Sequence, residues 1–312
     1  MKNYAIGVDV GGTSVKMGLF TKEGELKEKW SIPTNVEDNG RAILPDIAAS
    51  VKKKMQEKGL GEADVEGVGI GLPGPVDDSG VIRKAVNLHW DETFNVAEKL
   101  SRLLDGMKVK AGNDANVAAL GECWAGSGKG YNDLVMVTLG TGIGGGVIIN
   151  GKILAGVTGA AGEIGHIHVT DGEETQCNCG NHGCLEQYAS ATGIVRLLEK
   201  ELAATNEDSL MRTKKHTAKD LWDAVEEGDA LAIRVAEKFG AYLGKALAGI
   251  AAVLNPEIIV IGGGVSLSGE VIMPFITKNF TENVFHASRG TEFTRAKLGN
   301  DGGIYGAAKL VL

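Results

Sequence analysis

The chain has 312 residues, of which 43% are hydrophobic and 23% are charged, and its formal net charge at pH 7 is -8. This composition is that of an ordinary globular protein of about two domains, and its acidic balance argues against binding to nucleic acid. The most apolar stretch, Ala246–Leu254, is too short to cross a bilayer. The first residues show no secretory pattern, so we expect a cytoplasmic protein that does not bind membranes.

The first predicted element is a strand–turn–strand unit at residues 6–20, IGVDVGGTSVKMGLF. Adjacent glycines allow a backbone to approach a phosphate closely and to direct N–H groups toward it. The aspartate before the turn can hold Mg²⁺ or its waters, and the lysine can add a positive charge. The alternative is a tight hairpin without a ligand. The candidate nucleotide and magnesium ligands are Asp9, Gly11, Gly12, Thr13 and Lys16.

Strands and helices then alternate, which indicates an α/β fold. Helical periodicity predicts amphipathic helices at 42–58 and 96–104, with a buried strand at 65–71 between them. That strand enters the loop Leu72-Pro73-Gly74-Pro75.

The next helix, predicted at 115–124, is preceded by Asn113 and Asp114. Asn and Asp are favoured helix caps and need no other function at such a position. Alternatively, Asp114 is a general base that accepts the proton of an attacking hydroxyl, kept ionised by the helix N-terminus. A weak but well-placed base suffices for phosphoryl transfer. The glycine-rich hairpins favour both roles together.

A second strand–turn–strand unit at 135–149, VMVTLGTGIGGGVII, resembles the first. Five glycines in seven positions exceed what a simple hairpin needs, because each costs conformational entropy. Two such units indicate a duplicated fold that holds a polyphosphate. The sequence has no Walker A motif, and the glycines precede a strand, unlike those of a Rossmann fingerprint. The candidate nucleotide ligands are Gly140, Thr141 and Gly142.

Three cysteines crowd into eight residues, and a histidine precedes them. The set His166, Cys177, Cys179 and Cys184 suits a closed, tetrahedral, structural Zn²⁺ site. His168 is the rival histidine ligand, and free thiols are the alternative to a metal site. Two carboxylates flank the cluster, Glu163 and Glu186. A zinc loop would hold them in place as acceptors for sugar hydroxyls, although most glutamates are simply solvated.

The C-terminal half predicts helices at 189–203, 218–226 and 230–254, a buried strand at 258–261, and a last helix at 303–312. The strand is followed by Gly262, Gly263 and Gly264, where adenine could lie against bare backbone; a plain turn is nearly as good an interpretation. We expect a small N-terminal lobe at 1–116, joined by the last helix, and a large lobe with the zinc loop at 117–302.

The whole chain resembles the ROK family (repressors, open reading frames and kinases) of the actin-like ATPase superfamily. The motifs that carry the resemblance are residues 9–13, 71–74, 113–116, 139–146, 162–166 and 177–186. The resemblance implies a duplicated, ribonuclease H-like, two-lobed fold with a cleft between the lobes. The family's repressors carry a DNA-binding segment before the first hairpin, whereas this sequence begins at the hairpin. We therefore expect a kinase, most similar to the glucokinases of Gram-positive type, as segments 85–90 and 189–193 suggest.

The resemblance further implies Mg²⁺-assisted transfer of a phosphoryl group from ATP to the 6-hydroxyl of glucose, with Asp114 as the base. It implies that the sugar pocket is lined by Gly74, Asn113, Asp114, Glu163, His166 and Glu186. It also implies a homodimer or homotetramer. The alternatives are a kinase for N-acetylmannosamine, fructose or allose, a non-catalytic sugar-sensing regulator, and a mechanical actin-like ATPase.

Overall fold

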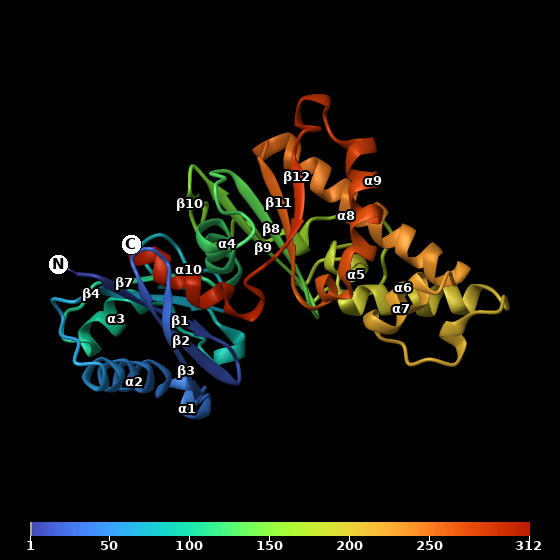
Figure 1. Cartoon of the computed structure of the whole chain (residues 1–312). Helices are drawn as coiled ribbons and strands as arrows, with labels where there is room; N and C mark the ends of the chain where they lie inside the picture. The colour runs from blue at the N-terminus through green and yellow to red at the C-terminus, as the bar shows by residue number, and fades with distance from the viewer. Residues whose placement is uncertain (1) are drawn as a thin grey trace. The chain divides into compact units, whose positions relative to one another are not determined.

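The computed structural model describes residues 2–312, which fold into two compact units (Figure 1). Among the described residues, the first unit comprises 2–134, Gly146–Gly162 and Lys297–Leu312, and the second comprises Val135–Gly145 and Glu163–Ala296. The backbone therefore passes between the units at four places.

The first unit contains a five-stranded sheet in the order β3-β2-β1-β4-β7. Its strands are β1 (Tyr4–Val10), β2 (Ser14–Thr21), β3 (Leu26–Pro33), β4 (Val65–Leu72) and β7 (Val109–Asn113). Strands β1, β4 and β7 are parallel, with Asp9 beside Gly71 and Leu72 beside Asn113 in the register. Their carboxyl ends therefore meet at one edge, where ligands bind in open α/β sheets.

Helices α2 (Ile43–Glu57) and α3 (Val96–Leu103) contact each other and belong to a core shared with the sheet. That core includes Val8 and Ile70 from the strands and Ile47 and Val51 from α2, all fully buried. The short elements of this region are α1 (Glu37–Gly40), β5 (Val81–Ile82), η1 (Val86–Leu88) and β6 (Phe94–Asn95).

Helices α4 (Asp114–Ala125) and α10 (Gly302–Val311) make backbone-to-backbone contacts in the first unit. A Cβ on Gly306 of α10 would lie 1.6 Å from the carbonyl oxygen of Val117 in α4. Likewise, a Cβ on Gly7 of β1 or Gly69 of β4 would lie within 2 Å of an α10 carbonyl oxygen. Only glycine permits such approach, so α10 is fixed against both the sheet and α4.

The second sheet has the order β10-β9-β8-β11-β12. Its strands are β8 (Leu134–Leu139), β9 (Ile143–Ile149), β10 (Lys152–Ile153), β11 (Ile258–Gly262) and β12 (Glu292–Arg295). Strands β11 and β12 are parallel, and β9 and β10 are antiparallel. Every residue of β11 is buried, as its continuous apolar sequence predicts.

The helices of the second unit are α5 (Glu186–Ala189), α6 (Ala191–Ala204), α7 (Ala218–Glu226), α8 (Ala230–Leu254) and α9 (Met273–Asn283). The 3₁₀ segments are η2 (Ile164–His166), η3 (Leu210–Arg212), η4 (Gly264–Ile272) and η5 (His286–Ser288), with η6 (Gly299–Asp301) in the first unit. The predicted single helix at 189–203 is wrong at its start, because Ser190 has an extended backbone and caps α6. Within residues 2–312, no helix has the length and apolarity needed to cross a membrane.

Substitution of Gly306 by Ala should strongly destabilise the protein, because the new methyl group has no space against α4. We expect a loss of about 1–3 kcal/mol or more in the free energy of unfolding, measured by urea denaturation. Gly249→Ala is the matched control: this helical glycine in α8 has nothing within 4 Å of the added Cβ. The control should be neutral or slightly stabilising. Equal stability of the two variants would contradict the close packing of α10.

Candidate active site and metal cluster

The candidate base lies at the start of α4, directly after β7. Asn113 is the N-cap: its Oδ1 accepts hydrogen bonds from the N–H groups of Ala115 (3.0 Å) and Asn116 (3.1 Å). Asp114 is the first helical residue, and its Oδ1 accepts from the Ala115 N–H at 2.8 Å. The cap role therefore belongs mainly to Asn113, and the carboxylate of Asp114 sits at the positive end of the helix.

Asn113 also fixes the loop that carries Gly74. Its Nδ2 donates to the carbonyl oxygen of Gly74 at 3.1 Å. Gly74 has a φ of 128°, and a Cβ there would lie 2.5 Å from the carbonyl oxygen of Lys84. The first unit thus brings together three of the residues predicted to line the sugar pocket: Gly74, Asn113 and Asp114.

The first glycine-rich hairpin joins β1 to β2. The N–H of Gly11 donates to the carbonyl oxygen of Ser14 at 3.0 Å, and the hydroxyl of Thr34, directly after β3, donates to the Gly11 carbonyl oxygen at 2.6 Å. Gly12 and Thr13 are exposed in the turn or close to it. Lys16 stands opposite Asp9 in the strand register and donates to the carbonyl oxygen of Asn300 at 3.2 Å.

Asp9 lies at the end of β1 against the first turn of α10. A Cβ on Gly303 would lie 2.6 Å from the carboxyl carbon of Asp9, so the carboxylate touches bare backbone there. Burial raises the pKa of Asp9, the charge of Lys16 lowers it, and the charge of Asp301 raises it. Burial disfavours the charge of this carboxylate, and Lys16 offsets that effect only in part. A cation bound with the ligand would stabilise the charged form. Sequence reasoning missed Gly303; the pair Gly302-Gly303 at a helix start was its only signal.

The second glycine-rich turn, between β8 and β9, is fixed to the start of α6. The carbonyl oxygen of Gly140 accepts from the Ala191 N–H at 2.8 Å, and that of Thr141 accepts from the Thr192 hydroxyl at 2.7 Å. Gly263, with a φ of 82°, packs on the backbone of Leu139 at the end of β8. The second unit therefore places the glycine run 262–264 beside this turn. The hydrogen bonds from the start of α6 to the turn could not be predicted from the sequence.

The second unit also contains a tight cluster of metal-ligand types. One ligand atom from each of His166, Cys177, Cys179 and Cys184 lies within 4.8 Å of all the others. The Sγ atoms of Cys179 and Cys184 are 3.6 Å apart, and the Cys177 Sγ is 3.7 Å from the His166 Nδ1. A Zn–S bond of about 2.3 Å gives a tetrahedron edge of about 3.8 Å, so the spacing fits a four-coordinate zinc ion.

The thiols have shifted pKa values that metal binding would relieve. Burial raises the pKa of Cys177 to about 12 and also raises that of Cys184, while a hydrogen bond from the Asn181 N–H lowers the pKa of Cys179. Thiols that remain protonated at neutral pH must release protons to bind a metal as thiolates. The donor set therefore fits zinc, and its affinity for zinc should rise with pH.

His166, and not His168, lies in the cluster. His168 is engaged elsewhere: its Nδ1 contacts the carbonyl oxygen of His182 at 3.0 Å and its Nε2 contacts Asp171 at 3.1 Å. The His166 ring has its Nδ1 toward Cys177 and its Nε2 3.9 Å from Glu163. The imidazole can therefore bind a metal on one side and face the predicted sugar carboxylate on the other.

Glu186 connects the cluster to the second glycine-rich turn. Its Oε1 accepts from the Cys177 thiol at 3.1 Å, and its Oε2 accepts from the Ile143 N–H at 3.3 Å. A Cβ on Gly142 would lie 2.5 Å from the same Oε2, so a side chain at this position would displace the carboxylate. Cluster and turn are thus one continuous assembly within the second unit.

A network of hydrogen bonds and an ion pair around Glu173 holds the loop that carries the cysteines. The carboxylate of Glu173 accepts a hydrogen bond from the Tyr188 hydroxyl and pairs with Arg196 on α6. Burial alone would raise the pKa of Glu173, but bonds from Tyr188, the Thr175 N–H and Arg196 outweigh it and lower the pKa to about 2. The sequence carries no signal for this network, because Arg196 lies 23 positions from Glu173.

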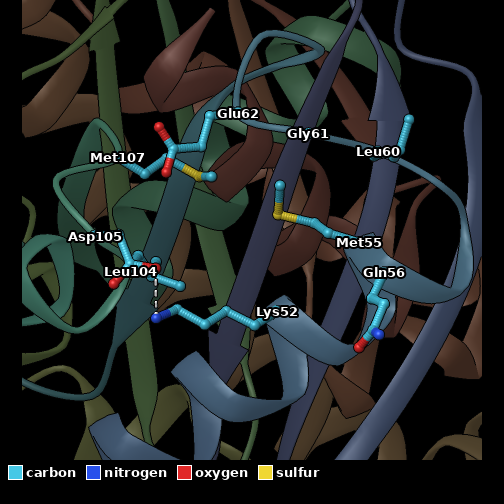
Figure 2. A pocket seen from close by; sticks show the side chains of 9 residues that line it. All are labelled: Lys52, Met55, Gln56, Leu60, Gly61, Glu62, Leu104, Asp105 and Met107. Atoms are coloured by element: carbon cyan, nitrogen blue, oxygen red, sulfur yellow. Dashed lines mark ion pairs between the residues drawn. The ribbon is translucent and has the colours of Figure 1, made fainter.

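A surface hollow of about 320 Å³ lies in the first unit beside the end of α2 (Figure 2). Its lining includes Met55, Leu104 and Met107, and Lys52 forms a 2.6 Å ion pair with Asp105 at its edge. None of the predicted site residues lines this hollow.

The model of the ROK family matches residues 5–312. The chain belongs to the ROK family. A glucokinase from Halalkalibacterium halodurans is 44% identical over 99% of this chain and 94% of its own length. An N-acetylgalactosamine kinase from a Shewanella species is 33% identical over 97% of this chain and 95% of its own length.

Among solved structures, a ROK family glucokinase from Streptomyces griseus, in complex with glucose and AMPPNP, is 34% identical to this chain. The TM-score is 0.74, and the match covers 98% of each chain. The fold is accordingly the two-lobed actin-like ATPase fold of ROK glucokinases. The family and the α/β fold class predicted from sequence are confirmed.

Replacement of Cys179 by Ser should abolish stoichiometric zinc binding. Cys179 is exposed, so if no metal were bound, the substitution would change stability little. If the wild-type protein binds zinc, the variant should lose the ion and have a lower thermal midpoint. Metal analysis by plasma emission spectrometry and thermal denaturation measure the two effects.

Cys123→Ser is the control for this experiment, since Cys123 lies on α4 outside the cluster and its thiol donates to the carbonyl oxygen of Tyr131. It should retain one zinc per chain. If Cys179→Ser also retains one zinc per chain, the proposed ligand set is wrong.

Proposed function

We propose that this protein is an ATP-dependent glucokinase that transfers the γ-phosphoryl group to the 6-hydroxyl of glucose. The observation that carries the proposal is the carboxylate of Asp114 at the N-terminus of α4, beside the Asn113–Gly74 contact. The glucose assignment is supported by 44% identity to a glucokinase along nearly the entire chain.

Asp114 acts as the general base. The helix N-terminus favours its ionised form, which is the form able to accept the proton of the sugar hydroxyl. Phosphoryl transfer has a loose transition state, so the proton leaves late and a weak base is sufficient if it is well placed. The cap bonds of Asn113 supply that placement by fixing the first turn of α4.

The two glycine-rich turns supply backbone N–H groups to the phosphates of ATP. Asp9 would hold Mg²⁺, directly or through water, and its raised pKa indicates that a cation at this point would be favourable. Mg²⁺, when bound with ATP, neutralises charge on the β- and γ-phosphates. Lys16, opposite Asp9, adds positive charge to the same hairpin.

Glu163, His166 and Glu186 are proposed to bind sugar hydroxyls. Zinc would be held by His166 and the three cysteines, and its role is to fix the imidazole and the neighbouring carboxylates in place. The contact between Glu186 and the turn at Gly142 supports this arrangement, because it places a residue proposed to bind sugar against a segment proposed to bind phosphate. Gly74 and Asn113 complete the set from the first unit.

The runner-up is a kinase of the same family for another sugar, which the N-acetylgalactosamine kinase relative favours. A coupled assay of ADP release with ATP and a sugar panel distinguishes the two. The panel contains glucose, mannose, fructose, allose, N-acetylmannosamine and N-acetylgalactosamine at matched concentrations. We expect glucose to have the highest kcat/KM. A higher value for any other sugar would overturn the glucose assignment, and absence of phosphorylation throughout would indicate a non-catalytic sugar sensor.

Substitution of Asp114 by Asn should reduce kcat by about 10²–10⁴-fold, the usual contribution of a general base. Glucose binding, measured by isothermal titration calorimetry, should survive in weakened form. Asp46→Asn is the matched control, an exposed aspartate in the first turn of α2, and it should keep kcat within about twofold of wild type. Near wild-type kcat in Asp114→Asn would show that another group accepts the proton.

A further inference from the structure

The first turn of α4 contacts both ends of the segment Gly146–Gly162, which connects two passages of the chain between the units. At the entry, a Cβ on Gly146 would lie 2.7 Å from the carbonyl oxygen of Ala115 and 3.1 Å from the Cα of Asn116. At the exit, the Asn116 side chain faces the carbonyl oxygen of Ala161. The turn that presents Asp114 is therefore also the anchor of this segment.

Asn116 makes the contact at the exit, and it does so incompletely. The residue is 2% exposed, and its Nδ2 donates to the Ala161 carbonyl oxygen over a long 3.5 Å. Its Oδ1 is buried and has no hydrogen-bond partner among the residues that the structure describes. Its own N–H belongs to the cap, since it donates to the Asn113 Oδ1.

A half-satisfied amide is a poor choice for stability at this position. Its helix neighbours Val117, Ala119 and Leu120 are apolar and buried, so an apolar residue of similar size would avoid the unpaired oxygen. Helix capping does not require it either, because its side chain is not the cap. A side chain that is costly for folding is best explained by what it positions.

The position it controls is the point where the chain leaves the first unit toward Glu163. Ala161 is followed by Gly162 and Glu163. Gly162 has a φ of 90°, a backbone conformation that glycine adopts readily and other residues rarely do. We propose that Asn116 is a positioning residue for phosphoryl transfer: it holds the departure point of Glu163 against the turn that presents Asp114. The inference rests on the proposed roles of Asp114 in proton transfer and Glu163 in sugar binding.

Two variants separate positioning from packing. Asn116→Ala removes the amide and its volume, whereas Asn116→Leu fills the volume without a donor. Asn95→Ala is the matched control: Asn95 caps α3 and its Nδ2 donates to the carbonyl oxygen of Ser79 at 2.9 Å, and neither Glu98, whose N–H it caps, nor Ser79 is a proposed site residue. Steady-state kinetics with glucose and MgATP and thermal midpoints are measured for all three and for wild type.

We expect both Asn116 variants to show a kcat at least tenfold lower and a higher KM for glucose, with the KM for MgATP within twofold of wild type. Asn116→Leu should match or exceed the wild-type thermal midpoint, and Asn95→Ala should lose stability but keep its kinetic constants. Wild-type kinetics in Asn116→Leu would overturn the inference and leave the glucokinase assignment intact. Failure of the wild-type protein to phosphorylate glucose would instead refute the proposed function.

Discussion

The placement of two proposed site residues of the first unit, Asp9 and Asp114, depends on close backbone packing around α10. Glycines at Gly7, Gly69 and Gly306 allow this helix to touch β1, β4 and α4 at distances that no side chain permits. Asp9 is the penultimate residue of β1 and Asp114 is the first residue of α4, so α10 packs against both elements that carry these carboxylates. Tightly packed interiors transmit strain, and a single added methyl group at such a contact is felt by both elements.

The second unit achieves rigidity by another route. Its sugar-binding candidates lie on short elements around the cysteine loop: Glu163 and His166 at the single turn η2, and Glu186 at the start of the four-residue helix α5. The cluster of His166 and the three cysteines and the hydrogen bonds of Glu173 connect these short elements, and Glu186 also contacts the turn that contains Gly142. The ionised carboxylate of Glu173 stabilises the fold fully at pH values above its ordinary pKa. This stabilisation is lost as the pH falls from there through the lowered pKa of about 2.

Local motifs allowed much of this protein to be predicted. The hairpins, the cap at Asn113, the helix at 230–254 and the ROK family are each encoded in contiguous residues with specific spacing. The roles of the individual site residues remain predictions. Contacts between residues distant in sequence were not predictable: the approach of Gly303 to Asp9, the pairing of Glu173 with Arg196, and the unpaired oxygen of Asn116. Each depends on the packing of elements whose individual sequences look unremarkable.

The position of Asp114 relative to the acceptor hydroxyl is the central claim, and a crystal structure with glucose, Mg²⁺ and a non-hydrolysable ATP analogue tests it most directly. The account predicts a carboxylate oxygen of Asp114 within about 2.6–3.2 Å of the glucose 6-hydroxyl. A 6-hydroxyl that faces a different carboxylate, with Asp114 retained only in the first turn of α4, would contradict it.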